Sequence, residues 1–390
     1  MGFFVPYSSL SSLKEYKYQS EDRSLVTKYV LKPYWQKFAP IFPAWMAPNV
    51  VTLLGFAFIV INFITVLIVD PTLTQGSPGW AYLSYAIGIF FYQTFDACDG
   101  IHARRTGQSG PLGELFDHCI DSINTTLSLI PFCSASRTGY TVLLILSQFT
   151  LLLNFYLSTW EEFHTHKLFL SEFSGPVEGI LIIAAIFVLS AIYGDEAVWH
   201  YNLCTIPIGS EPFNVEFIHF VFVFCTLGLL FNTLSARRNV ITYYRASTPD
   251  KNTCDAKVDA AMKGLLPFFV FFFSVFTVII VEPSFITLPF VLTIGLTAAF
   301  VVGRIIVSHL TKQPFPMLNL PMFIPSVQLI FYNVAVFILR KDPEEVVKAL
   351  VWLGLGISFG THALFINEII FEFTSYLDVY ALSIKHPKKA

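Results

Sequence analysis

Four aspartates stand close together in the run QTFDACDGIHARRTGQSGPLGELFDHCIDS. They are Asp96, Asp99, Asp117 and Asp121. The first two are three residues apart and the last two are four apart, so each pair can occupy one face of a helix. Gly107 and Pro111 lie between the pairs, which predicts a tight turn. The two helices would then run antiparallel, and the four carboxylates would converge on one site.

Small residues share the helix faces of these aspartates. Each of Gly100, Ala103 and Gly113 stands four residues from one of the aspartates. Because no bulky side chain covers these positions, a phosphate group can approach the backbone closely. Arg104 adds a planar fork of donors that matches phosphate oxygens. The combination predicts a site for a phosphate-containing ligand.

The elements that hold these residues are expected to lie in a membrane. Hydrophobic residues make up 54% of the 390-residue chain, charged residues make up 13%, and the mean hydropathy is +0.62. Soluble proteins average about 25% charged residues, so this chain has too few charges to cover a soluble surface. Its 41 Phe and 17 Tyr argue against disorder, and its net charge of −3 argues against a nucleic-acid partner.

Runs of about 20 apolar residues predict ten membrane-spanning helices. They cover residues 48–69, 80–101, 113–133, 139–159, 176–194, 215–235, 263–282, 286–308, 322–340 and 346–372. Residues 20–47 mix basic and aromatic side chains, which predicts an interfacial amphipathic helix before the first span, with a solvated lead-in as the alternative. The sequence therefore predicts an all-α polytopic membrane protein.

Basic residues predict how the chain is oriented. Of the 24 Lys and Arg residues, 18 lie before the first span, in the loops after spans two, four, six and eight, or in the tail. Loops 70–79 and 195–214 contain none, and Arg137 is one of four exceptions. Since Lys and Arg favour the cytosolic side, both termini and the even-numbered loops are expected to face the cytosol.

The chain is expected to have four parts. They are a cytosolic or interfacial N-terminal segment (1–47), a catalytic transmembrane domain (48–235) containing the motif at 96–121, further transmembrane helices (236–372) and a cytosolic tail (373–390).

Four carboxylates in a partly dry site need compensating charge. Each would cost roughly 2.5–3.5 kcal/mol near the bilayer centre. Divalent cations supply that charge, and oxygen ligands favour Mg²⁺ or Mn²⁺. Two ions that share carboxylates form a clamp suited to phosphoryl transfer. The alternatives are an ion or proton pathway, as in a transporter, and a structural salt-bridge cluster. A transporter does not need the small residues or Arg104, and few basic residues lie near enough for a salt-bridge cluster.

The motif resembles that of the CDP-alcohol phosphotransferase family, D-x₂-D-G-x₂-A-R-x₈-G-x₃-D-x₃-D. Eight fixed positions would match by chance roughly once in 10⁹ starts. The segments WMAPNVVTLLG (45–55), STWEEFHTHKL (158–168) and GPVEG (175–179) are similar to the eukaryotic choline/ethanolamine phosphotransferase branch. The resemblance implies transfer of phosphocholine from CDP-choline to diacylglycerol, which forms phosphatidylcholine and CMP. Transfer of phosphoethanolamine from CDP-ethanolamine, or use of both donors, is the alternative.

The resemblance also implies a role for each site residue. The four aspartates would ligate two Mg²⁺ or Mn²⁺ ions, while Arg104 and the small residues Gly100, Ala103 and Gly113 would bind the diphosphate. Asn49 could contact the nucleotide through its amide or instead cap the first span. Gly107 would offer its backbone to the cytidine.

A general base must accept the proton of the diacylglycerol hydroxyl. A histidine side chain ordinarily titrates near neutral pH, which makes His118 a candidate, and Glu114, four residues earlier, could orient its ring. Asp121 is the alternative, although a carboxylate that binds cations is a poor base because the cations stabilise its ionised form. His164 and His166 are further candidates.

The sequence also suggests which residues lie near the choline group and where in the cell the protein resides. Glu161 and Glu178 are expected near the mouth of the cleft, and Trp160 and Tyr156 are candidates for an aromatic choline cage. The resemblance implies a homodimer in the endoplasmic reticulum membrane, with the Golgi as a second location and the active site facing the cytosol.

Overall fold

A computed structural model describes residues 2–16, 19–22, 24–170, 176–208 and 211–387. Residues 388–390 of the expected tail, residues 1, 17, 18 and 23 of the expected N-terminal segment, and Gly175 of the GPVEG segment lie outside the described residues.

One group of helices contains the motif. It consists of α2 (Pro48–Val69), α3 (Gly79–Thr106), α4 (Pro111–Ala135), α5 (Val142–Thr165), α6 (Pro176–Tyr193), the short α7 (Asp195–Trp199) and α8 (Phe217–Ser247). Helix α4 packs against both α2 and α3, while α6 packs on α3 and α8 on α5. The segment expected as a catalytic domain is therefore a helical bundle, although α8 continues past residue 235 to Ser247.

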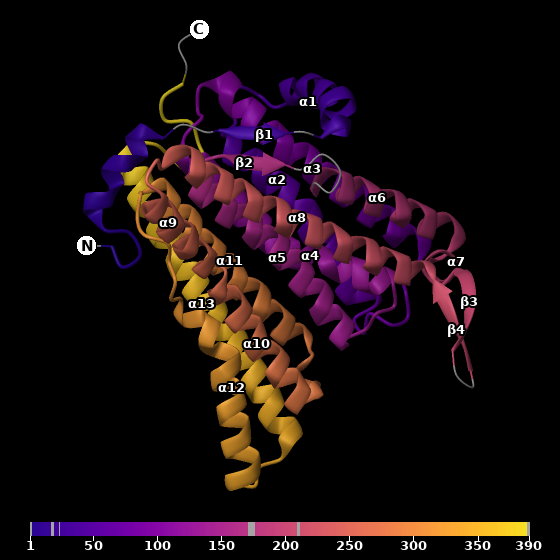
Figure 1. Cartoon of the computed structure of the whole chain (residues 1–390). Coiled ribbons are helices and arrows are strands. Elements are labelled where there is room, and N and C mark those ends of the chain that lie inside the picture. The colour runs from indigo at the N-terminus through magenta and orange to yellow at the C-terminus, as the bar shows by residue number, and fades with distance from the viewer. Residues whose placement is uncertain (1, 17–18, 23, 171–175, 209–210, 388–390) are drawn as a thin grey trace.

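A second group of helices follows. It consists of α9 (Lys251–Lys263), α10 (Leu266–Val281), α11 (Leu288–Leu310), α12 (Ile324–Asn333), which continues as a π-helical turn (Val334–Ile338), and α13 (Pro343–Leu377). Helix α11 joins the two groups because it packs against α4, α5 and α13. In Figure 1 the two groups diverge toward the end opposite α1 and the C-terminus.

The helical segments agree with the predicted spans. Within the described residues, each of the ten predicted runs coincides with a helix, and seven helical segments are long and apolar enough to cross a membrane. The other three are α3 and α4, which contain the aspartates, and α6, which has only 18 residues. The prediction of an all-α polytopic membrane protein is confirmed.

Two small sheets interrupt this helical architecture, and the apolar pattern of the sequence predicts neither of them. Strand β1 (Ser20–Asp22) pairs in parallel with β2 (Leu168–Leu170), and β3 (Asn202–Ile208) forms an antiparallel hairpin with β4 (Glu211–Glu216). The hairpin lies in the segment expected to be a plain loop. Its β-branched residues and two prolines, Pro207 and Pro212, disfavour a helix there.

The N-terminal segment contains the expected amphipathic helix. A π-helical turn (Thr27–Leu31), α1 (Lys32–Phe38) and a 3₁₀ turn (Ala39–Ile41) follow one another. One face buries Leu31, Trp35 and Ala39 against Val51 and Cys98 of α2 and α3. Helix α1 covers one end of the bundle (Figure 1). Lys32 and Lys37 are exposed, so its charges face away from the bundle.

Contacts between loops show which loops lie together at the same end of the helices. At one end, Ser20 pairs with Leu168, and Gln108 Nε2 donates to His386 O at 3.0 Å. These contacts gather the N-terminal segment, the loops after predicted spans two and four, and the tail, as the charge pattern predicts.

The opposite end holds the exceptional Arg137. Its Nε lies 2.5 Å from Asp195 Oδ2, and its Nη1 lies 3.2 Å from Glu196 Oε2. The bond to Asp195 raises the pKa of the Arg137 guanidinium. Two acidic residues at this end therefore pair with a basic side chain that departs from the pattern.

Candidate metal and nucleotide site

A sharp turn places the two motif helices side by side. Helix α3 ends at Thr106, and Gly107 follows in the left-handed region with φ of +72°. Glycine is favoured there because it lacks a Cβ. Helix α4 begins with Pro111, whose missing N–H costs nothing in the first turn of a helix. The predicted turn is therefore confirmed.

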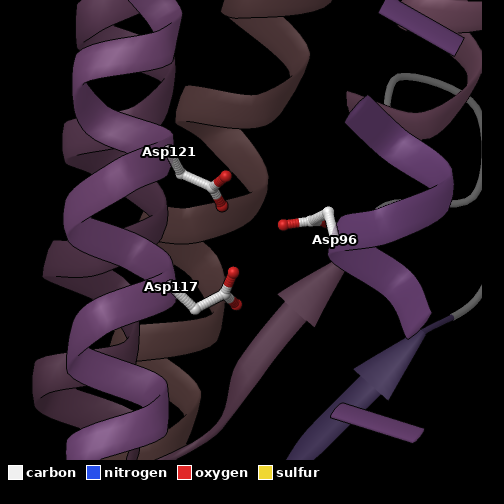
Figure 2. Close-up of side chains that lie close together, drawn as sticks. All are labelled: Asp96, Asp117 and Asp121. Carbon is white, nitrogen blue, oxygen red and sulfur yellow. The ribbon is translucent and has the colours of Figure 1, made fainter. Parts of the chain in front are cut away.

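Three of the four aspartates form a compact cluster. Asp96 on α3 and Asp117 and Asp121 on α4 each offer a carboxylate oxygen, and these oxygens all lie within 4.8 Å of one another. Figure 2 shows the three side chains pointing toward one another from the two helices. Asp121 Oδ1 also accepts a hydrogen bond from the Tyr92 hydroxyl.

The cluster fits a cation. Asp96 Oδ1 and Asp117 Oδ1 are buried and have no hydrogen-bond partner among the described residues. Buried carboxylate oxygens are costly without a partner, and a cation satisfies several of them at once. The cluster can therefore hold a metal ion, as the motif predicts.

Asp99 stands beside this cluster rather than in it. Its side chain is 8% exposed, and Oδ2 accepts a hydrogen bond from Thr52 Oγ1 on α2. It also interacts with the carboxylate of Asp117. Asp99 thus adds negative charge to the same site while being tied to a third helix.

The small-residue faces leave open space. A Cβ placed on Gly113 would lie 4.0 Å from Asn49 Oδ1, and one placed on Gly100 would lie 3.6 Å from Arg104 Nη1. By contrast, a Cβ on Gly295 of α11 would lie 2.4 Å from Thr126 Oγ1. Glycine at 295 is explained by helix packing. Packing does not require glycine at 100 or 113, which leaves room for a ligand.

Asn49 lies at this open face but does not cap α2. The helix begins at Pro48 with Ala47 as its N-cap residue, and no side chain caps it. The capping alternative is therefore wrong. Asn49 Nδ2 instead donates to Ala381 O of the tail at 2.9 Å.

Glu114 and His118 lie on α4 next to the aspartates. Glu114 Oε2 accepts a hydrogen bond from the Tyr16 hydroxyl, and Glu162 of α5 is an electrostatic neighbour. His118 interacts with His309 of α11. Among the described residues, no hydrogen bond joins Glu114 to His118, so their expected pairing is not formed here.

His164, a further candidate base, is held by packing. Its Nδ1 lies 2.9 Å from the Tyr244 hydroxyl, and its ring stacks on Phe315 at 5.9 Å. His166 is the left-handed C-cap of α5, and its ring lies 5.2 Å from that of His309. Burial lowers the pKa of His166.

The proposed cage residues have structural partners. Tyr156 donates to Gly264 O at 2.6 Å, and Trp160 Nε1 donates to Ala261 O at 2.8 Å. Both side chains are buried and hold the junction between α9 and α10 against α5, which argues against a choline cage there. Of the two expected glutamates, Glu161 accepts from Asn239 Nδ2 at 2.7 Å, and Glu178 accepts from the Ser24 hydroxyl.

An apolar cavity of about 420 Å³ between α4, α11 and α13 is separate from this site. It is lined by Ile123, Thr126 and Leu127 of α4, among others. At about 100° per residue, Ile123, two residues after Asp121, projects about 160° away from it around the helix axis. The cavity therefore lies behind α4, away from the aspartates.

Clustered carboxylates and open small-residue faces on membrane helices define a membrane-bound phosphotransferase. The sequence profile of CDP-alcohol phosphatidyltransferases matches residues 45–209, which include all four aspartates. The chain is 56% identical over 394 residues to cholinephosphotransferase 1 of Saccharomyces cerevisiae, with 100% of both chains covered. It is 57% identical over 389 residues to choline/ethanolaminephosphotransferase 1 of the same yeast, again with 100% of both covered. Choline/ethanolaminephosphotransferase 1 of Arabidopsis thaliana is 30% identical, with 98% of each chain covered. The chain belongs to the CDP-alcohol phosphatidyltransferase family, which confirms the resemblance inferred from the motif.

Proposed function

We propose that the protein transfers phosphocholine from CDP-choline to 1,2-diacylglycerol and releases CMP. The observation that carries this proposal is the half-buried cluster of Asp96, Asp117 and Asp121, in which two buried carboxylate oxygens lack partners among the described residues. Relatives named for choline alone and for both alcohols are equally similar to this chain. Use of CDP-ethanolamine beside CDP-choline is therefore the second candidate.

The four aspartates would hold two Mg²⁺ or Mn²⁺ ions. Asp96, Asp117 and Asp121 supply the clustered oxygens, and Asp99 adds charge from the side. Ligands that are all oxygen favour these two hard cations. When bound, the ions would neutralise the charge that develops on the diphosphate as CMP leaves.

The nucleotide diphosphate would lie against the open faces of the motif helices. Gly100, Ala103 and Gly113 keep side-chain bulk away from it, and Arg104 donates to its oxygens. Asn49 and the backbone of Gly107 would contact the nucleoside at the mouth of the site.

A proton acceptor lies on the same arc of α4 as the metal ligands. At about 100° per residue, four side chains project within an arc of about 100°, in the order Asp117, Asp121, Glu114 and His118. We assign His118 as the base that accepts the proton of the diacylglycerol hydroxyl and Glu114 as the group that orients it. Asp121 remains the alternative base, and the packing of His164 makes it a weaker candidate than either.

The depth of the site suits one soluble and one lipid substrate. Asp99 lies seven residues before the end of α3, which corresponds to about 10 Å along the helix axis. A nucleotide could enter from the water at that end, while diacylglycerol approaches from the bilayer. We place this end in the cytosol, with α1 in the membrane interface and the protein in the endoplasmic reticulum as a homodimer.

A transfer assay tests the proposed function. The full-length protein in nanodiscs containing diacylglycerol should release CMP from CDP-choline and form phosphatidylcholine, with CDP-ethanolamine measured in parallel. Asp96→Asn should abolish release, while Asp259→Asn, which changes an exposed carboxylate on α9, should leave it intact. A wild-type protein that releases no CMP from either donor would favour a transporter.

A further inference from the structure

The N-terminal arm, residues 2–16, is anchored at its start between two helices of the second group. Phe4 N donates to Glu368 Oε1 of α13 at 2.6 Å, and Arg304 Nη1 of α11 donates to Phe4 O at 3.0 Å. The Phe4 ring packs edge-on against Phe365 at 5.2 Å. The arm therefore starts from a fixed point rather than as a free tail.

The arm then runs as a 3₁₀ helix (Tyr7–Glu15) toward the motif. Leu10 and Leu13 are buried in the main hydrophobic core, and Glu15 forms an ion pair with Lys312. The next residue, Tyr16, donates its hydroxyl to Glu114 Oε2. The anchored arm thus places the Tyr16 hydroxyl against the Glu114 carboxylate of α4.

Glu114 lies in an acidic environment where such a donor matters. Its neighbour Glu162 is 7% exposed and interacts with both Glu114 and Glu161, which is 4% exposed. Asn239 supplies a donor to Glu161. Among the described residues, no ion pair involves Glu114, and the donor that reaches it is the Tyr16 hydroxyl. A buried carboxylate is held in place by its donors, since losing one is costly.

We propose that Tyr16 is a positioning residue for the transfer reaction. Its hydroxyl fixes the carboxylate of Glu114 through Oε2. Oε1, which makes no hydrogen bond to His118 in this structure, would then be free to turn toward that ring, one helical turn further along α4. Tyr16 acts through Glu114 and does not touch the reacting atoms. This inference rests on the proposed function, specifically on Glu114 and His118 as the base.

Tyr16→Phe removes the hydroxyl and keeps the ring. In full-length protein in nanodiscs, we expect kcat to fall about tenfold, the effect of losing one hydrogen bond of ordinary net strength. The KM for CDP-choline should stay at the wild-type value, and the variant should remain folded at the assay temperature even if its melting temperature falls slightly. Tyr7→Phe is the matched control because it makes the same change in the same arm at a residue that is 70% exposed. An unchanged kcat, or a loss explained by a lower melting temperature, would overturn the proposal.

A double-mutant comparison separates this inference from the base assignment. Glu114→Gln should be slow, and Tyr16→Phe should cause no further loss in that background because the two residues act as one unit. The same tenfold loss in both backgrounds would show that Tyr16 acts elsewhere and overturn the inference. Wild-type rates in Glu114→Gln and His118→Ala would overturn the base assignment itself. A slow Glu114→Gln with a normal Tyr16→Phe would overturn the role of Tyr16 alone.

Discussion

Adding a single methyl group at Gly113 tests whether the open face of α4 is reserved for substrate. A Cβ at this position would have Asn49 Oδ1 as its nearest neighbour, at 4.0 Å, which is an ordinary contact distance. The protein can therefore accept Gly113→Ala without moving any neighbour. Alanine also favours the helix over glycine by up to about 1 kcal/mol, so the variant should be at least as stable as the wild type.

The effect on catalysis should be the opposite. If the diphosphate lies against Gly113, the methyl group pushes it away by about 1 Å, and such a misplacement can cost about 10²-fold in rate. We expect kcat/KM for CDP-choline to fall by about that factor. Gly100→Ala should behave in the same way because its Cβ would meet only the guanidinium of Arg104, at 3.6 Å.

The test measures CMP release and thermal unfolding of each variant under the same solution conditions. Gly360→Ala on α13 is the matched control, since a Cβ there meets nothing within 4 Å, and both its stability and its rate should be preserved. Gly295→Ala is the packing control. Its Cβ would lie 2.4 Å from Thr126 Oγ1, so it should lose about 1–3 kcal/mol of stability. Normal kinetics in Gly113→Ala would refute the placement of the substrate, and reduced stability would show that packing requires this glycine.

Three further outcomes are expected. A chelator should abolish CMP release, and added Mg²⁺ or Mn²⁺ should restore it. Asp117→Asn should raise the Mg²⁺ concentration needed for the half-maximal rate. Full activity in the presence of chelator would exclude the metal site. His118→Ala should lower kcat by about 10²–10⁴-fold with little change in the KM for CDP-choline. His164→Ala should mainly affect the stability of the protein. A normal rate in His118→Ala would make Asp121 the base instead. Epitope tags at the two termini should be protected from protease together in sealed microsomes, and opposite accessibility would mean an odd number of spans.

The sequence predicts the parts of this protein that depend on local patterns. Apolar runs locate the helices because a span needs a minimum apolar length. The three- and four-residue spacings locate the carboxylates because they repeat with the helical turn. Gly107 and Pro111 mark the turn because each has a backbone preference that acts at its own position.

The residues that hold the carboxylates could not be predicted in this way. Tyr92 is 29 residues from Asp121, and Thr52 is 47 residues from its partner Asp99. Tyr16 is 98 residues from Glu114. Each is an ordinary residue of an apolar or N-terminal segment, and only the packing of separate elements brings it to the site. The capping alternative for Asn49 fails for a local reason, because α2 starts at Pro48 and the Asn49 side chain reaches the tail instead.

The two ends of the chain contact different parts of the site, so we expect changes in them to affect the reaction differently. The N-terminal arm reaches Glu114, on the edge of α4 that we assign to proton transfer. The tail reaches Asn49 and Gln108, at the mouth that we assign to the nucleotide. Changes at the first contact should act on the chemical step, and changes at the second should act on binding of the soluble substrate. Helix α4 connects the nucleotide side of the site with the proton-transfer side. Its open face at Gly113 and the arc that carries Glu114 and His118 lie on the same helix. We therefore expect the membrane-spanning bundle to set the positions of the charges and the segments outside it to affect proton transfer and nucleotide binding.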